Sequence, residues 1–154
     1  MALSDKAVEF LTKYQQAPET YETQFLKLVE VEKEYKNKAR LDDKASVVYK
    51  FRVPMFASNL NKNMHGGSVA LLADLCCSIT TTSSDRSGRL HPHVIDSQIS
   101  YHKGSGINEL IYVITEIEKA SRRFISLKWS IFSENGELLY SGRNLKYYPE
   151  TEKL

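Results

Sequence analysis

Residues 65–80 read HGGSVALLADLCCSIT, a strongly apolar stretch near the middle of the 154-residue chain. No turn residue interrupts it from Ser68 to Thr80, a length that exceeds an average strand and predicts a buried helix. Apolar residues occupy most of the circumference of this helix, so a β-sheet has to wrap around it to bury it. The stretch therefore predicts one long central helix held in a curved sheet.

Strand patterns lie on both sides of the predicted helix. Val47–Val53 alternates as a half-buried strand does, and Pro54 ends it. Asn135-Gly136 is a strong hairpin signal that joins the last two of four later strands. These four strands are expected at residues 94–102, 110–117, 124–132 and 138–147. One helix against one antiparallel sheet is an α+β arrangement, and the wrapped helix makes it the hotdog fold.

The first 44 residues show a different pattern. Residues 4–15 have apolar side chains at helical spacing, with Ser4 placed to cap the first turn. A second short helical stretch has one apolar face, made of Phe25, Leu28 and Val29. The charged residues 30–44 are typical of a solvated connector or an edge strand. We therefore predict a helical N-terminal extension over residues 1–44 and a hotdog domain over residues 45–154.

The basic and acidic residues of the chain nearly balance. A formal charge of +2, from 21 basic and 19 acidic residues, gives no reason to expect nucleic acid or an anionic membrane as the partner. No apolar run approaches the ~20 residues that span a bilayer. Asp5 and Glu9 argue against a signal peptide, so we expect an intracellular protein, cytoplasmic or organellar. Glu152 replaces the small first residue of the Ser-Lys-Leu peroxisomal address, so peroxisomal import is not expected.

Neither the cysteines nor the histidines predict a metal centre. Cys76 and Cys77 are adjacent, so on a helix they point in different directions and are expected to be reduced core residues rather than a disulfide. A zinc site made of His65, His91 and His93 is an alternative, but these histidines follow no known ligand spacing. We predict no metal and no cofactor.

Asp74 does not fit the apolar segment that contains it. Burying an unpaired carboxylate costs several kcal/mol, so something has to compensate it. One interpretation is a structural Asp that bonds a loop amide or lies on a narrow exposed stripe. The other is a desolvated carboxylate that acts as a base or a nucleophile.

His65-Gly66-Gly67 is the second feature that packing does not explain. Two glycines at a helix start cost stability, but they leave approachable N–H groups at the positive end of the helix dipole, where an oxyanion can be stabilised. A plain hinge between loop and helix is the alternative. Gly66 and Asp74 lie about 12 Å apart along one helix, too far to act on one reacting atom, so a site shared by two subunits is expected.

At these residues the chain resembles the phenylacetate-degradation-type branch of the hotdog acyl-CoA thioesterases. The family pattern is an Asn, then a His-Gly-Gly six residues later, then four variable residues, a Leu, any residue and an Asp. This chain keeps every spacing, with Asn59, His65-Gly66-Gly67, Leu72 and Asp74. Residues 94–101, VIDSQISY, are similar to the family's strand that ends in Tyr. The resemblance covers roughly residues 45–148.

The resemblance implies a thioester hydrolase that acts on an acyl-CoA. By analogy, the Gly66 amide and the Asn59 side chain polarise the thioester carbonyl, and Asp74 of the facing subunit activates water. His65 orients Asn59 and the loop, and Gly67 belongs to the same substrate-binding turn. The CoA phosphates need cations at the mouth of the acyl tunnel, for which strand-end residues are the candidates: Lys103, Arg122 and Arg123. Solvated strand-end charges are the alternative for these three.

From the separation of Gly66 and Asp74 we also expect a homodimer or a dimer of dimers, with Val47–Val53 at an open sheet edge where a second copy pairs. One departure bears on activity: the family often has Ser or Thr seven residues before the strand-ending Tyr, and this chain has Val94. A non-catalytic acyl-CoA or lipid-binding protein is therefore an alternative function. A hotdog dehydratase also uses a His and an acid, but its motifs differ.

Overall fold

The computed structural model describes residues 1–37, 40–85 and 92–149. Its N-terminal part contains two helices and a two-residue strand: α1 (Leu3–Gln15), α2 (Tyr21–Leu26) and β1 (Glu30–Val31). The central part contains β2 (Ser46–Arg52), the short 3-10 helix η2 (Met55–Ala57) and the long helix α3 (Gly66–Ser84). Four strands complete the chain: β3 (His93–Tyr101), β4 (Leu110–Ala120), β5 (Phe124–Ser133) and β6 (Leu138–Tyr147).

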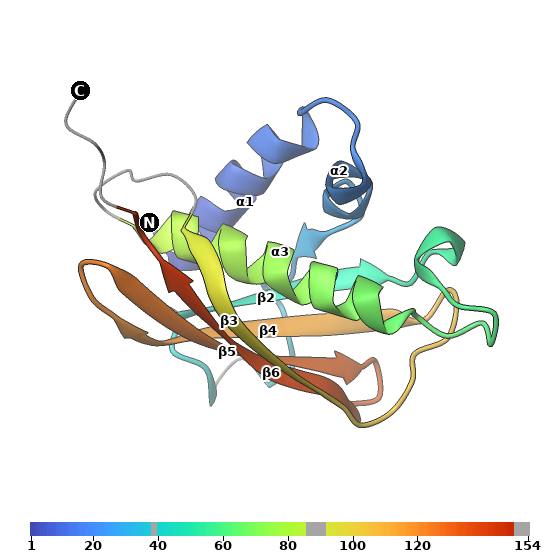
Figure 1. The fold of residues 1–154 in the computed structure, drawn as a ribbon. Coiled ribbons are helices and arrows are strands. Elements are labelled where there is room, and N and C mark those ends of the chain that lie inside the picture. Colours follow the sequence, from blue (N-terminus) through green and yellow to red (C-terminus); the bar gives the residue numbers. More distant parts are fainter. Residues whose placement is uncertain (38–39, 86–91, 150–154) are drawn as a thin grey trace.

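The six strands form one antiparallel sheet in the order β1-β2-β4-β5-β6-β3. Figure 1 shows α3 lying along one face of this curved sheet, with α1 and α2 on the side of α3 that faces away from it. The predicted hotdog fold is therefore confirmed: an α+β fold in which a curved antiparallel sheet wraps a central helix, preceded by an N-terminal helical part.

The apolar circumference of α3 explains why it is covered on both sides. Leu72 and Cys76 are one turn apart and fully buried, as is Trp129 of β5 in the same core. The other face of α3 is covered by the N-terminal helices, whose Leu3, Ala7 and Leu11 belong to this core too. Residues 1–44 thus share a hydrophobic core with the rest of the chain, and the division at residue 45 stays a prediction.

Two local predictions in the N-terminal part are wrong. Ser4 does not cap α1, since the N-cap is Ala2 and no side-chain cap bond forms there. The side chain of Thr20, by contrast, caps α2 by accepting from the Thr23 N–H. Leu28 is 43% exposed, because α2 ends at Leu26 and the expected apolar face does not continue through it. Phe25 and Val29 are buried as predicted.

The strand expected at the open edge is an interior strand. β2 pairs with β1 on one side and with β4 on the other, because Glu30–Val31 forms the edge strand that the charged connector offered as one of two interpretations. At the opposite edge lies β3, which among the described strands pairs with β6 alone. Its nine residues are almost all exposed, so β3 is the long unpaired edge of the sheet.

Candidate active site

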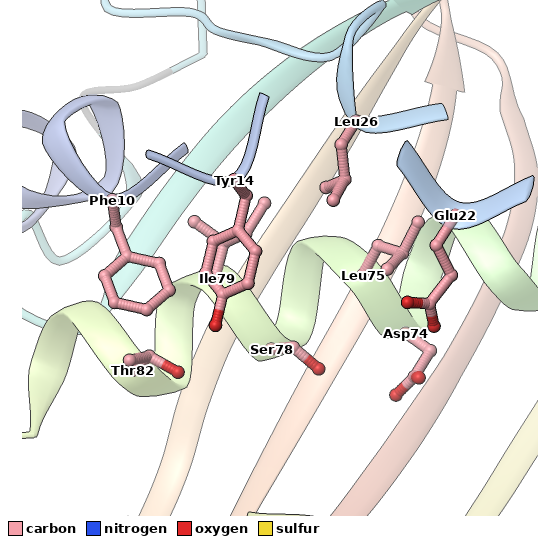
Figure 2. A pocket seen from close by; sticks show the side chains of 9 residues that line it. All are labelled: Phe10, Tyr14, Glu22, Leu26, Asp74, Leu75, Ser78, Ile79 and Thr82. Atoms are coloured by element: carbon pink, nitrogen blue, oxygen red, sulfur yellow. The ribbon is translucent and has the colours of Figure 1, made fainter. Parts of the chain in front are cut away.

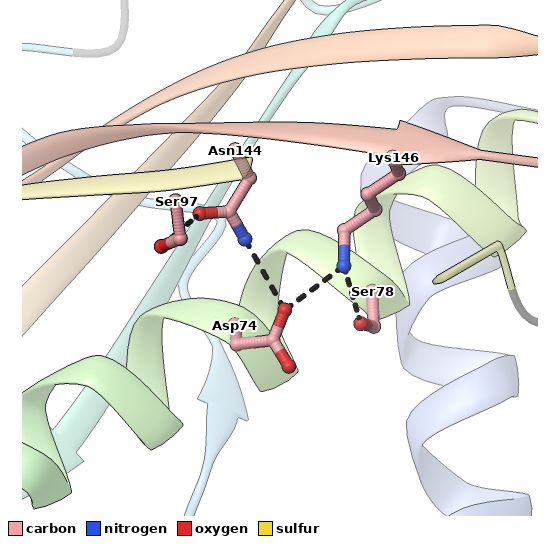
Figure 3. Close-up of polar contacts among 5 residues, drawn as sticks. All are labelled: Asp74, Ser78, Ser97, Asn144 and Lys146. Atoms are coloured by element: carbon pink, nitrogen blue, oxygen red, sulfur yellow. Dashed lines mark hydrogen bonds and ion pairs between the residues drawn. The ribbon is translucent and has the colours of Figure 1, made fainter. Parts of the chain in front are cut away.

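Asp74 lies on α3 and faces β6, where two side chains bind its carboxylate. Lys146 Nζ donates to Asp74 Oδ1 over 2.9 Å, and Asn144 Nδ2 donates to the same oxygen over 3.2 Å. Figure 3 shows both bonds meeting at one carboxylate oxygen. Within the described residues, Asp74 Oδ2 accepts no hydrogen bond. The carboxylate is therefore held at one oxygen and open at the other.

The surroundings of Asp74 fit the interpretation of a narrow exposed stripe on the helix, but not that of a desolvated carboxylate, and its partners are side chains of β6 rather than a loop amide. Its side chain is 40% exposed, so the carboxylate is not enclosed in an apolar interior. Its ion-pair partner Lys146 is fully buried, with 0% exposure. The Asp74 carboxylate is thus compensated by the ammonium group of Lys146, and the buried member of this ion pair is the cation.

Asp74 lines a pocket of about 320 Å³ between α3 and the N-terminal helices. Figure 2 shows Phe10 and Tyr14 toward one end of this pocket, with Glu22 and Asp74 toward the other. The remaining lining residues are Leu26, Leu75, Ser78, Ile79 and Thr82. The pocket thus combines an aromatic and aliphatic wall with carboxylates, a combination suited to an apolar group attached to a polar one.

His65 closes the first turn of α3. Its Nδ1 accepts from the Gly67 N–H over 2.9 Å, so His65 is the N-cap of the helix. No hydrogen bond joins His65 to Asn59 in the described residues, so the orienting contact implied by the family resemblance is not seen. The Gly66 N–H has no acceptor among the described residues, whereas the Gly67 N–H is engaged by His65. The Gly66 N–H therefore remains available as a donor at this helix start.

Tyr101, at the end of β3, covers the same turn. Its hydroxyl donates to the Gly66 carbonyl over 3.0 Å. A Cβ atom at position 66 would lie 3.3 Å from the Tyr101 ring, tighter than most packing contacts. The tyrosine that ends the family-like strand thus packs against Gly66, the first glycine of the His-Gly-Gly motif, and a side chain at position 66 would have to displace its ring slightly.

Asn59 lies in the loop before α3, and its side chain shapes that loop. Asn59 Oδ1 accepts from the Asn61 N–H over 3.0 Å and from the Asn63 N–H over 3.2 Å. Its amide nitrogen has no hydrogen bond within the described residues, so that N–H₂ group is available as a donor. Asn59 and His65 line a second, wider hollow of about 730 Å³.

The two halves of the predicted site line different hollows of one chain. Asp74 lines the pocket beside α1 and α2, and Asn59 lines the hollow at the start of α3. Gly66 and Asp74 are separated by eight residues of the same helix, or about 12 Å. A single subunit therefore does not bring the carboxylate and the carbonyl-polarising donors together.

The three candidate phosphate ligands do not form one cluster within a chain. Lys103 follows β3 at the end of the sheet near the β5–β6 hairpin, where it forms an ion pair with Glu137 that raises the pKa of Lys103. Arg122 and Arg123 lie in the β4–β5 turn, at the opposite end of β5. A cationic rim made of all three would need more than one subunit.

The cysteines beside Asp74 are buried free thiols, as predicted. Burial raises the pKa of Cys77 to about 12 and raises that of Cys76 well above its usual value. Both are therefore protonated at neutral pH and unsuited to nucleophilic attack. In the described part of the chain, no group of three His, Cys, Asp or Glu side chains could hold a metal ion, and His91 lies outside the described residues. No helix in that part is long and apolar enough to cross a bilayer.

Sequence reasoning missed Asn144 and Lys146. Alternation along β6 puts these two on one face with Gly142, and puts Arg143 on the other face. Because both faces carry a cation, periodicity could not show which one meets α3. A usable signal was that the Asp74 carboxylate needs a compensating partner. Lys146 is that partner, although it lies 72 residues further along the sequence.

Several solved structures share this fold. The zebra fish thioesterase superfamily member 2 is 21% identical with a TM-score of 0.77, over 94% of this chain and 97% of that chain. The E. coli PaaI protein from the phenylacetic acid degradation operon is 14% identical with a TM-score of 0.73, over 96% of each chain. A hypothetical thioesterase from Streptococcus pneumoniae, solved with coenzyme A, is 20% identical with a TM-score of 0.64, over 77% of this chain and 86% of that chain.

These identities are low, so the likeness to solved structures is one of fold. A comparison with curated proteins gave no significant match. The family assignment comes from the sequence: a family model described as Thioesterase superfamily matches residues 61–140, a range that includes the helix start and Asp74. The chain therefore belongs to the thioesterase superfamily.

Proposed function

We propose that this protein is an acyl-CoA thioesterase, which hydrolyses a fatty or aryl acyl-CoA to the free acid and CoA. The observation that carries the proposal is the Asp74 carboxylate, which is held at Oδ1 by Lys146 and Asn144, has no hydrogen bond at Oδ2 among the described residues, and belongs to a residue that lines a partly apolar pocket. Support also comes from two solved neighbours, one determined with coenzyme A and one bound to acetyl CoA.

The proposed reaction is general-base hydrolysis. Asp74 Oδ2 takes a proton from water while the water oxygen adds to the thioester carbon. The oxyanion that forms accepts hydrogen bonds from the Gly66 N–H and the Asn59 amide. The tetrahedral species then breaks its C–S bond, and the proton held by Asp74 goes to the departing CoA sulfur. His65 and Gly67 keep the helix start in shape through their hydrogen bond.

We further propose that each site is shared between two copies of the chain. In this arrangement the Asp74 carboxylate of one copy faces the Gly66 N–H and the Asn59 amide of the other copy. The distance between Gly66 and Asp74 along one α3 helix then does not prevent them from acting on one substrate. The edge strand β3 is the candidate pairing surface, because its backbone groups are unpaired on one side and its nine residues are almost all exposed. In this assembly Lys103 of one copy and Arg122 and Arg123 of the other are the candidate CoA phosphate ligands.

A second function, acyl-CoA binding without hydrolysis, is favoured by Val94. This residue pairs with Lys146 in the β3–β6 register and has no hydroxyl with which to hold a water molecule near Asp74. Ser97, three residues further along β3, reaches the site indirectly by donating to Asn144 Oδ1 over 3.2 Å. The two functions share a ligand and differ in turnover.

The deciding experiment measures steady-state hydrolysis across a panel of short, medium, long and aryl acyl-CoA substrates. We expect turnover by the wild type and a fall in kcat of about 10²-fold or more for Asp74→Asn, which keeps acceptors for Lys146 and Asn144 but cannot take the proton. Asp5→Asn is the matched control, since Asp5 is also paired with a lysine, Lys33, but lies outside the pocket. Tight acyl-CoA binding with no turnover by the wild type would favour the binding function.

A further inference from the structure

We infer that Lys146 is a positioning residue for Asp74: its ammonium group fixes Asp74 Oδ1 so that Oδ2 faces the pocket as an anionic base. This inference rests on the proposed hydrolysis and extends it to a residue outside the family-like motif. Lys146 does not line the pocket, so it acts through Asp74 and not on the substrate.

The burial of Lys146 is the first observation. Among the described residues, it is the only lysine or arginine that is buried. Its ammonium group donates to two oxygens, both on α3: Asp74 Oδ1 at 2.9 Å and Ser78 Oγ at 3.0 Å. A buried ammonium is costly unless it is paired, so its placement has to be matched by these partners. Asp74 supplies the opposite charge, and Ser78 lies one turn further along the same helix face.

The second observation is the geometry at the carboxylate. Asn144 and Lys146 are two residues apart on β6, so their side chains point to the same face of the strand and both reach Asp74 Oδ1. Asn144 is itself held by Ser97, whose hydroxyl donates to the side-chain oxygen Oδ1 of Asn144. Figure 3 shows this chain of contacts from β3 through β6 to α3. Two donors on one oxygen restrict the rotation of the carboxylate and leave the other oxygen without a hydrogen bond among the described residues.

A role of Lys146 in folding alone would not require an ion pair with Asp74. Replacing a buried ion pair by apolar side chains of similar volume is often neutral or stabilising, so an ion pair is a poor way to fasten α3 to the sheet. Asp74 is the exposed member of this ion pair, and it lines the pocket. An ion pair that only fastens α3 to the sheet would not need a carboxylate at the pocket. The charge of Lys146 is therefore better explained by its effect on Asp74 than by its effect on folding.

The test is a double-mutant cycle that joins Lys146→Met with Asp74→Asn and measures kcat, KM and the free energy of unfolding. Methionine keeps most of the volume of the lysine stem and removes the charge. We expect Lys146→Met to lower kcat on the order of 10-fold or more through misplacement of the base, with little change in KM. In the Asp74→Asn background the same substitution should leave the residual kcat unchanged, because the group on which it acts is no longer a base.

Two further variants complete the design. Lys146→Gln keeps a neutral donor and secures folding if the Met variant is unstable, and it should still lower kcat. Lys128→Met is the matched control, because Lys128 forms an exposed ion pair with Glu116 on β5 and β4, and its kcat should equal that of the wild type.

The outcomes separate the inference from the proposed function. If the wild type hydrolyses acyl-CoA and folded Lys146 variants keep its kcat, or lose equal factors in both Asp74 backgrounds, Lys146 is structural and the inference is overturned while the function stands. If the wild type hydrolyses no thioester, the proposed function and the inference both fail.

Discussion

At the scale of single residues, the pairing of Asp74 with Lys146 is the contact with the largest consequences. The partners come from α3 and β6, 72 positions apart, and they differ in burial: Lys146 is fully enclosed and Asp74 is 40% exposed. Removing one partner therefore has different effects from removing the other. Without Lys146, the carboxylate still meets solvent. Without Asp74, the ammonium group is left inside the protein with Ser78 as its remaining acceptor among the described residues.

This asymmetry gives a stability prediction. We expect Asp74→Ala to lower the free energy of unfolding by about 3 kcal/mol, since it leaves the buried Lys146 ammonium group without its compensating charge. The double variant Asp74→Ala with Lys146→Met should recover most of that loss, because it leaves no charge behind. Urea denaturation followed by circular dichroism measures both. A loss of less than about 1 kcal/mol in the single variant would show that the ammonium group finds water or another acceptor, and that the pair is less important than described.

At the scale of secondary-structure elements, the contact between β6, β5 and β3 positions Asn144 and Lys146. Gly142 stands two residues before Asn144 on β6, opposite Trp129 of β5 and next to the backbone of β3. A Cβ atom there would lie 2.1 Å from the Gln98 carbonyl oxygen and 2.5 Å from the Trp129 ring. Neither neighbour can move freely, since one is backbone and the other is a fully buried side chain. The absence of a side chain at this position lets the three strands close on one another.

Gly142→Ala should therefore destabilise the fold by about 2 kcal/mol or more, as overpacking does in a closed core. Because the displaced strands hold Asn144 and Lys146, kcat should fall as well in whatever fraction remains folded. Gly136→Asn is the comparison: this hairpin glycine has open space around it, so a substitution there meets the strain of φ +86° but no packing clash, and asparagine is among the residues that adopt positive φ most readily. Thermal unfolding compares the two variants. Equal melting temperatures for Gly142→Ala and the wild type would contradict the close approach of the strands.

At the scale of the whole molecule, the question is how many chains make one site. Within one chain, Asp74 and Asn59 line different hollows. The sheet offers one long exposed edge, β3, and its other edge strand, β1, has two residues. Pairing of two β3 strands around a two-fold axis would bring two α3 helices side by side and form two equivalent sites.

Complementation tests this assembly. An Asn59→Ala chain and an Asp74→Asn chain should each be nearly inactive, since one lacks the oxyanion donor and the other lacks the base. Random mixing makes half of the dimers mixed, and each mixed dimer contains one intact site of two, so about a quarter of wild-type activity should return. Subunit exchange is verified separately by mass spectrometry of differently tagged chains. Exchange without recovered activity would show that each site belongs to one chain.

The sequence by itself determined the parts of this protein that depend on local pattern. Apolar circumference identified α3, alternation identified the strands around it, and Asn135-Gly136 identified the β5–β6 hairpin, where Gly136 adopts the positive φ that the turn needs. It also marked Asp74 and the His-Gly-Gly turn as features that packing does not explain. Each of these signals comes from residues close together in the chain, where spacing and side-chain chemistry are sufficient.

The tertiary structure decided which strand is the open edge and which residues hold Asp74. Periodicity tells which residues share a face of a strand, but not which strand lies next to it, so β2 was expected at the edge that β3 occupies. In the same way, it could not choose between Arg143 and Lys146, which lie on opposite faces of β6. The physical reason is that pairing order and burial are properties of contacts between distant segments. Only the folded sheet, with α3 packed against it, places an ammonium group beside that carboxylate.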